Sequence, residues 1–331
     1  MSLCSLMTKV FLASLGNYKD ACEALQARDA EAIRQAIWNK RKYQPRSLID
    51  GRSIFDLVSS PLAGKDADYP FPGLNQLTGG LRRGEMVTWT AGSGVGKSTA
   101  IGEITQSLIE QNQKVLTINL EESTKRTGLR LMTVVANKPL HLDNQIDEKA
   151  FRDAFDRSVG SGRCFLRDGF GSVNADALLN DVRYMTMNEG VQWVIIDHLS
   201  ILLSDNEADD ERRLIDRVMT RLRSFVEETG IGMILISHLK RGSGDKGHED
   251  GMSVSMSQLR GSASIAQLSD IVISISRNIT SGDNTAKVTV HKNRFNGQTG
   301  EAATLSYTKE TGRLLEIPTT GAEASQDYGD F

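Results

Sequence analysis

The stretch Ala91-Gly-Ser-Gly-Val-Gly-Lys97-Ser98 decides the fold. It stands between an apolar run, Met86–Thr90, and an amphipathic run, Ser98–Gln111. It fits the pattern GxxxxGK followed by Ser or Thr, except that Ala91 replaces the first glycine, where a small residue is what matters. Glycines let the backbone curl so that its N–H groups face a phosphate, and a helix that begins at Lys97 adds its positive end. The order strand, loop, helix therefore predicts a site for the phosphates of a nucleoside triphosphate.

Each residue of this loop has an expected task. The backbone cradles the phosphates, Lys97 reaches the β- and γ-phosphates, and the Ser98 hydroxyl binds Mg²⁺. A glycine-rich turn before a helix can be only a tight turn, but the GKS sequence after a strand favours the nucleotide site. The expected nucleotide-binding residues of the loop are Gly92, Ser93, Gly94, Val95, Gly96, Lys97, Ser98 and Thr99.

Short β-rich runs alternate with amphipathic segments downstream of Gly84. The expected strands are Met86–Thr90, Val115–Leu120, Cys164–Arg167, Trp193–Ile196 and Met233–Ile236. The expected helices are Ser98–Gln111, Glu148–Val159, Asn174–Asn188 and Glu211–Thr229. This alternation predicts an α/β fold with a mostly parallel central sheet and helices on both faces. Runs separated by turns predict an antiparallel C-terminal extension, over Ile271–Ser276, Lys287–His291 and Ala303–Tyr307.

Acidic residues follow two of the expected buried strands. The carboxyl ends of parallel strands meet at one edge of a sheet, which is where ligands bind. Asp197 is therefore the expected Walker B acid, which holds the metal together with Ser98, although an acid there can also cap a turn. Glu121 directly follows its strand and is the expected base that orients water, whereas Glu122 could cap the next helix.

A histidine and two glycine-containing loops follow the strand Met233–Ile236. His238 ends this strand at the same sheet edge, which favours a γ-phosphate sensor over a hydrogen-bonded core histidine. The loops carry basic residues and suit contact with the backbone of single-stranded DNA. Nearby acids almost cancel their charge, so a solvated surface loop is an equal alternative. The expected DNA-binding residues are Lys240, Arg241, Lys246, Arg260 and Gly261.

The composition restricts the class of protein. The 331 residues, 39% hydrophobic and 24% charged, fit a soluble globular protein with a sizeable core. We expect no signal peptide and no membrane partner, because no apolar run approaches the roughly 20 residues that span a bilayer. A net charge of −3 excludes a broadly basic coat. Three cysteines, odd in number and far apart, argue against disulfides and structural zinc and favour a reducing, cytoplasmic setting.

Seven segments in this order closely resemble the helicase domain of podovirus-type phage replicative primase-helicases: AGSGVGKST, NLEES, VIIDHLSI, ERRLIDRVMTRLRSF, ISHLKR, QLRGSASIAQLSD and KNRFNGQTG. The Twinkle and DnaB helicases are more distant relatives. The resemblance, which covers about Gly73–Ile317, implies a RecA-like P-loop NTPase. It implies a homo-hexameric or heptameric ring that moves 5′→3′ on single-stranded DNA using ATP or a dNTP. A RecA/RadA-type recombinase ATPase and a RecA-like ATPase that acts on protein are the alternatives.

The resemblance also assigns roles to matching positions. It implies that Glu121 is the catalytic base and that His238 is the phosphate sensor. Arg294 matches an arginine finger that acts on the nucleotide of the adjacent subunit, although such an arginine could also be a surface charge. Arg277 and Tyr307 fall where the family clamps the nucleotide base.

The N-terminal region carries helical patterns. Ala21–Trp38 has apolar residues at three- and four-residue steps and predicts a helix. Ser53–Val58 predicts a short helix that needs a partner, and Ala63–Pro72 reads as a polar connection.

The resemblance divides the chain into four expected parts. Residues 1–40 resemble the C-terminal end of a primase Toprim domain, without its acidic or zinc motifs, so we expect a chain that begins just inside the primase or is truncated there, and no primer synthesis. Residues 41–72 form a linker whose helix docks on a neighbouring subunit, and residues 73–318 form the helicase domain. Residues 319–331 form an acidic disordered tail whose terminal Phe331 contacts the replicative DNA polymerase.

Overall fold

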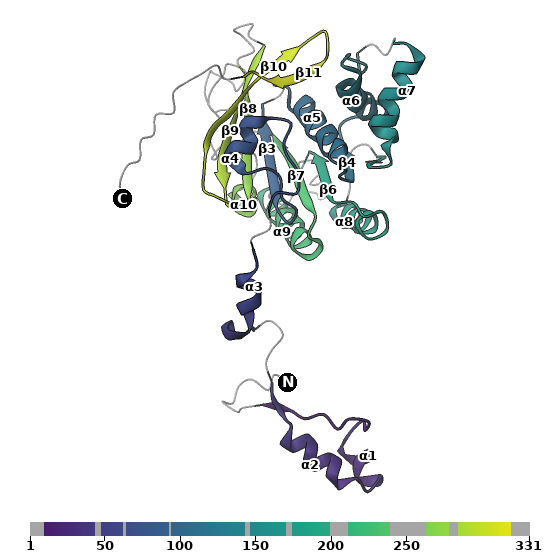
Figure 1. Ribbon diagram of the computed structural model, residues 1–331, viewed down its shortest axis with the longest axis vertical. Coiled ribbons are helices and arrows are strands. Elements are labelled where there is room, and N and C mark those ends of the chain that lie inside the picture. The colour runs from purple at the N-terminus through teal and green to yellow at the C-terminus, as the bar shows by residue number, and fades with distance from the viewer. Residues whose placement is uncertain are drawn as a thin grey trace, which may run out of the picture. The chain divides into compact units, whose positions relative to one another are not determined.

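The computed structural model describes residues 10–43, 48–61, 64–92, 94–142, 146–169, 174–198, 211–238, 263–277 and 284–318. The chain forms two compact units, Met1–Ala63 and Gly64–Phe331 (Figure 1). None of the described helices is both long and apolar enough to cross a membrane.

The first unit contains short helices and one small sheet. Strands β1 (Phe11–Leu12) and β2 (Arg41–Lys42) pair in antiparallel fashion around α1 (Ala21–Gln26) and α2 (Ala30–Trp38). The helical pattern expected over Ala21–Trp38 is present as two helices rather than as one. The helices are separated because Arg28 takes a left-handed φ of 57° and Asp29 then caps α2 by accepting from the N–H of Ala32.

A short helix follows close to its expected position. The 3₁₀ turn η2 (Gly51–Ile54) leads into α3 (Phe55–Ser59). Phe55, Leu57 and Val58 are exposed in the structure. The docking of this helix on a neighbouring subunit stays a prediction.

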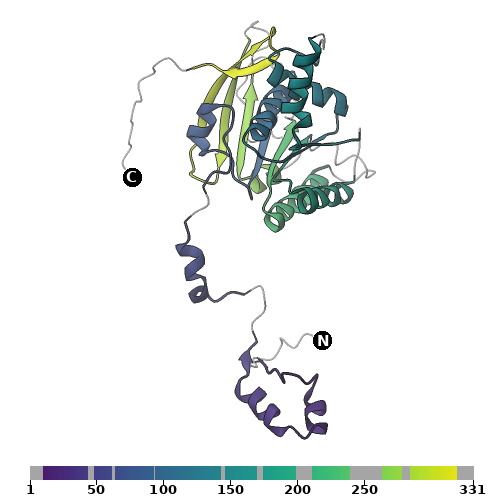
Figure 2. The same cartoon turned by 45° about the vertical axis from the view of Figure 1, so that its right-hand side comes forward.

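Among the described residues, nine strands form the sheet at the core of the second unit, in the order β11-β10-β9-β8-β3-β7-β6-β4-β5. The mutually parallel strands are β3 (Met86–Ala91), β4 (Val115–Asn119), β5 (Cys164–Arg167), β6 (Trp193–Asp197), β7 (Gly232–His238) and β8 (Ile271–Ser276). The antiparallel strands are β9 (Thr285–Asn293), β10 (Gly300–Thr308) and β11 (Arg313–Glu316). Figure 2 shows these C-terminal strands, light green to yellow, forming one side of the sheet. The predicted α/β architecture is confirmed.

The expected start of the antiparallel extension, at Ile271–Ser276, is wrong. β8 runs parallel to β3, with Ile273 beside Trp89, so the antiparallel extension begins only at β9. A parallel neighbour needs a crossover connection. Helix α10 (Ala263–Leu268) precedes β8, and its six residues are too few to give a clear helical period in the sequence.

Helices cover both faces of the sheet. One buried cluster joins α4 (Pro72–Thr78) and α5 (Lys97–Glu110) to the sheet, and the other joins α8 (Ala175–Tyr184), α9 (Glu211–Thr229) and α10. The apolar face of α9 is buried, at Leu214, Val218, Leu222 and Phe225. Helices α6 (Thr124–Ala136), which the sequence pattern did not predict, and α7 (Glu148–Arg157) share a third, smaller cluster.

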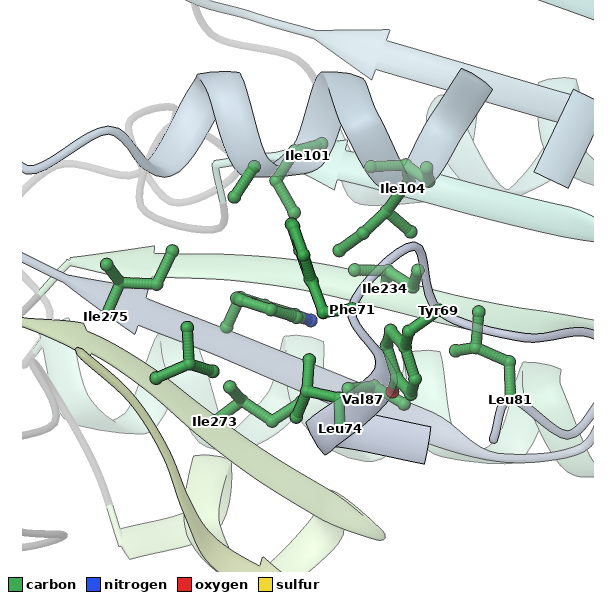
Figure 3. Packing of buried hydrophobic residues seen from close by; sticks show 14 of the residues in the cluster. Tyr69, Phe71, Leu74, Leu81, Val87, Ile101, Ile104, Ile234, Ile273 and Ile275 are labelled. Atoms are coloured by element: carbon green, nitrogen blue, oxygen red, sulfur yellow. The ribbon is translucent and has the colours of Figure 1, made fainter. Parts of the chain in front are cut away.

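The segment before α4 belongs to this core. Tyr69 and Phe71 are 3% and 1% exposed, although the sequence pattern treats Ala63–Pro72 as a polar connection. Figure 3 shows Ile101 and Ile104 of α5 pointing toward Phe71. Two aromatic residues among polar ones carry no period, so their burial is not evident from the sequence. The compact unit accordingly begins at Gly64, upstream of the Gly73 boundary suggested by the resemblance.

Candidate functional site

The glycine-rich loop joins β3 to α5 at the carboxyl edge of the parallel strands. Gly94 and Gly96 have φ values of 73° and 98°, which only glycine adopts without strain, and Gly96 caps the N-terminus of α5. Ala91 is fully buried as the last residue of β3, beside Ile275 of β8. The loop therefore leads into the N-terminus of α5, where backbone N–H groups favour the binding of a phosphate. Ser93 lies outside the described residues.

Strand register brings the expected acids to this same edge. Asn119 at the end of β4 lies beside Asp197 at the end of β6, and the N–H of Leu120 donates to the carbonyl of Asp197 at 2.8 Å. His238 ends β7 beside Ala91 of β3. The side chain of His238 lies outside the described part of the chain, so only its place at the edge is fixed.

Lys97 and Asp197 are both buried at the site, at 8% and 4% exposure. Burial lowers the pKa of Lys97, while the nearby charges of Asp197 and Glu121 act in the opposite direction. Burial likewise raises the pKa of Asp197, and Lys97 opposes this shift. The lysine and the carboxylate thus stabilise each other's charge in a poorly solvated place.

The residues at this edge fit a magnesium ion that is shared with a nucleotide. Asp197 Oδ1 is buried and has no hydrogen-bond partner among the described residues, so an oxygen ligand is available. Ser98 stands in the first turn of α5. The described residues contain no group of three or more His, Cys, Asp or Glu side chains that could hold a metal by themselves. Mg²⁺ commonly takes one or two protein ligands and completes its shell with phosphates and water.

Glu121 lies beside a histidine that the sequence analysis missed. Its Oε1 is 2.6 Å from Nε2 of His198, which directly follows Asp197 and is buried, whereas the Glu121 side chain is 48% exposed. The available signal was position, because a polar residue after a buried strand reaches the ligand edge of a parallel sheet.

Glu122 faces a different environment. Its Oε2 is 2.9 Å from Nη2 of Arg130, and its Oε1 accepts from Nδ2 of Asn119 at 3.1 Å. The cap of α6 is Ser123, which accepts from the N–H of Arg126, so Glu122 does not take the alternative role of a helix cap. A carboxylate held by α6 in this way is poorly placed to orient water, which favours Glu121 as the base.

A pocket opens on the other side of the glycine-rich loop. Its lining residues are Gly94, Val95, Gly96, Thr99, Arg277, Asn284, Ala286, Tyr307 and Leu314. Nη2 of Arg277 donates to Oδ1 of Asn284 at 3.0 Å, and the N–H of Tyr307 donates to the carbonyl of Asn284 at 3.1 Å. The structure therefore brings Arg277 and Tyr307, which are 30 positions apart, to the loop that is expected to bind phosphates.

The model of the DnaB-like helicase C-terminal domain family matches residues 68–316. The chain belongs to this family. It is 35% identical to the DNA helicase/primase of Enterobacteria phage T3, over 94% of this chain and 57% of that protein. It is 23% identical to the replicative DNA helicase DnaC of Bacillus subtilis, over 75% of this chain and 56% of that protein. The chain thus spans little more than half the length of these relatives.

The fold agrees with the family. The solved structure of a DnaB-like replicative helicase, determined for its interactions with primase, superimposes with a TM-score of 0.69 at 19% identity, over 90% of this chain and 74% of that one. The RecA-like architecture expected from the resemblance is therefore confirmed.

Arg294 of this DnaB-like domain lies far from the domain's own glycine-rich loop. It follows β9, whose last residue Asn293 pairs with Ile271 at the start of β8, whereas Ala91 pairs with Ile275 near the end of β8. At about 3.3 Å per residue, the two edges are on the order of 15 Å apart. Its side chain is 50% exposed, with Nη1 3.4 Å from Oδ1 of Asp270.

The remaining expected residues are those that would contact DNA and those of the C-terminal tail. Lys240, Arg241, Lys246, Arg260 and Gly261 lie outside the described residues, as does the tail that ends at Phe331. Their roles stay predictions.

Proposed function

We propose that this chain is the motor of a ring-shaped replicative DNA helicase, which hydrolyses a nucleoside triphosphate and moves 5′→3′ on single-stranded DNA. The observation that carries the proposal is the meeting of Lys97, Glu121 and Asp197 at one sheet edge in a DnaB-like chain. The relatives from phage T3 and Bacillus subtilis are both named as DNA helicases. The family match does not favour the RecA/RadA-type recombinase.

In the proposed hydrolysis, each residue at the carboxyl edge of the sheet has its own task. The loop N–H groups, Thr99 and Lys97 bind the phosphates, and Glu121 accepts a hydrogen bond from the attacking water. Mg²⁺, held by Ser98 and Asp197, would neutralise charge that develops on the phosphates. His238 senses the γ-phosphate and passes its loss to the loop that follows β7. Burial of Lys97 and Asp197 supports these roles, because charges act more strongly where water is excluded.

The nucleotide base occupies the pocket beside the loop. Arg277 and Tyr307 clamp the base. Both residues contact Asn284, which supports their forming one wall of the base pocket. An aromatic face and a guanidinium both stack on any base.

Arg294 completes the site of a neighbouring subunit. Its place at the amino edge, away from the phosphate loop of its own chain, supports action in trans. Such a residue requires a second copy, so it also supports a homo-hexameric or heptameric ring. The exposed apolar side chains of α3 support docking of the linker on that neighbour.

Contacts with other macromolecules complete the proposal. Lys240, Arg241, Lys246, Arg260 and Gly261 contact single-stranded DNA, and the acidic tail with Phe331 contacts the replicative DNA polymerase. The motor acts in the cytoplasm, that of the host if a phage encodes it. Cys22 and Cys164, the free cysteines of the described part, support a reducing compartment.

The proposal is tested by measuring hydrolysis of ATP and each dNTP with and without single-stranded DNA. We expect DNA to stimulate hydrolysis in the native protein and Lys97→Ala to abolish it. DNA-stimulated hydrolysis that survives Lys97→Ala would contradict the proposal. Electron microscopy of the protein with DNA and nucleotide separates a closed ring, the expected result, from the open filament of a recombinase.

A further inference from the structure

A close contact at the carboxyl edge joins two side chains from neighbouring strands. Glu121 follows β4 and His198 follows β6, and these strands are held in register by the bond from Leu120 N–H to the Asp197 carbonyl. Nε2 of His198 is 2.6 Å from Oε1 of Glu121. In the role of a base the Glu121 carboxylate can only accept, and the ring nitrogen is then the donor.

The two side chains differ in their freedom. Glu121 is about half exposed, and a glutamate has three rotatable bonds, so its carboxylate would sample many positions at an open edge. His198 is buried, and close packing around a buried ring restricts its movement. Because the two oxygens of a carboxylate lie in one rigid plane, a bond that fixes Oε1 also restricts where Oε2 points.

We propose that His198 is a positioning residue for Glu121. Its Nε2–H fixes Oε1 and thereby aims the carboxylate at the water that attacks the γ-phosphate. The inference rests on the proposed function of Glu121 as the base. It extends that function by adding a residue that orients the base, an arrangement common in hydrolytic sites.

A purely structural role for His198 makes different predictions. A histidine that only fills space at the sheet edge would affect folding and nucleotide binding as much as turnover, and it would do so whatever residue stands at position 121. A positioning residue affects kcat, and only while Glu121 is present.

The experiment compares three substitutions at position 198 in the full chain, with ATP and single-stranded DNA. His198→Gln keeps an N–H donor near the position of Nε2, His198→Asn keeps an amide that is too short, and His198→Leu has no donor. We expect His198→Leu and His198→Asn to lower kcat by roughly 10- to 100-fold, as misplacement of a catalytic group does. The KM for ATP and the midpoint of unfolding should stay close to those of the native chain, and His198→Gln should recover most of the rate.

A second set places His198→Leu in a Glu121→Gln background. We expect less than a twofold further loss, because there is no base left to position. A full 10- to 100-fold loss in that background would overturn the inference, as would a rise in KM parallel to the loss of kcat. The inference also fails if His198→Gln does not recover the rate and His198→Leu lowers the unfolding midpoint. Each of these results would leave the proposed function intact. If Glu121→Gln alone hydrolyses ATP at the native rate, the proposed role of Glu121 fails instead.

Discussion

Arg294 and Asp270 meet at the amino edge of the sheet, with Nη1 of the arginine 3.4 Å from Oδ1 of the aspartate. The other carboxylate oxygen, Oδ2, accepts from the N–H of Met86 at 2.8 Å. Asp270 therefore ties the arginine to the first residue of the strand that leads to the phosphate loop. The contact places the guanidinium at a defined and partly exposed point on the surface.

Mixing two inactive variants tests whether Arg294 acts in trans. We expect Arg294→Ala and Glu121→Gln each to reduce hydrolysis by at least 100-fold, because a finger and a base both act on the transition state. Mixed rings contain interfaces in which an intact Glu121 meets an intact Arg294, so hydrolysis should recover partly and pass through a maximum with the mixing ratio. No recovery at any ratio would mean that both residues serve one subunit.

The stability of Arg294→Ala provides the control for this experiment. The side chain is half exposed, and exposed ion pairs contribute about 0–1 kcal/mol, so the variant should unfold at nearly the native denaturant concentration. A large loss of stability would show that the arginine holds the fold.

Phe71→Ala tests whether the compact unit includes the segment that follows Gly64. Phe71 is 1% exposed and packs in the cluster shown in Figure 3, so its truncation should destabilise this unit by about 3–5 kcal/mol. Phe55→Ala is the matched control, because Phe55 is 72% exposed and its loss should change the free energy of unfolding by no more than about 0.5 kcal/mol. Equal denaturation midpoints for the two variants would contradict the assignment of Phe71 to the core.

His291 makes the stability of the sheet depend on pH. Its Nε2 is 2.7 Å from Oγ of Ser274, and burial lowers its pKa. In the unfolded chain the histidine takes up a proton near pH 6.5, whereas in the folded chain it does so only at a lower pH. The unfolded state thus binds more protons in that window, and the free energy of unfolding must fall as the pH falls from 7 through 6.5 toward 5.

Chemical denaturation at several pH values measures this effect. His291→Gln keeps a polar partner for Ser274 but does not titrate, so its free energy of unfolding should change less between pH 7 and 5. His141 also has a pKa lowered by burial, so part of the slope should remain in the variant. A slope unchanged by His291→Gln would show that the buried imidazole does not contribute.

The sequence predicted those features of the site that follow from strand order. Glu121, Asp197 and His238 each end a buried run, and parallel strands bring such ends together whatever lies between them. His198 was missed because its proposed role depends on a contact with Glu121 between two strands, which no spacing in the chain reveals. The direction of β8 was missed for a related reason, since the short helix α10 has no sequence period of its own.

Tyr307 gives a test of the base pocket that is separate from the chemistry of hydrolysis. Tyr307 lines the pocket that also contains Gly94 and Arg277. In the strand order, β10 lies on one side of β3, whereas β6 and β4 lie on the other. Stacking of a base on an aromatic ring contributes about 1–3 kcal/mol, so Tyr307→Ala should raise the KM for ATP by roughly 10-fold or more. Because the ring binds the ground state and the transition state alike, kcat should change little.

Tyr307→Phe keeps the stacking face and loses only the hydroxyl, so its KM should stay within about twofold of the native value. Steady-state hydrolysis over a range of ATP concentrations separates the two constants. A fall in kcat at unchanged KM would move Tyr307 from base binding to the chemical step. A tenfold rise in the KM of Tyr307→Phe would assign the recognition of the base to the hydroxyl rather than to the ring.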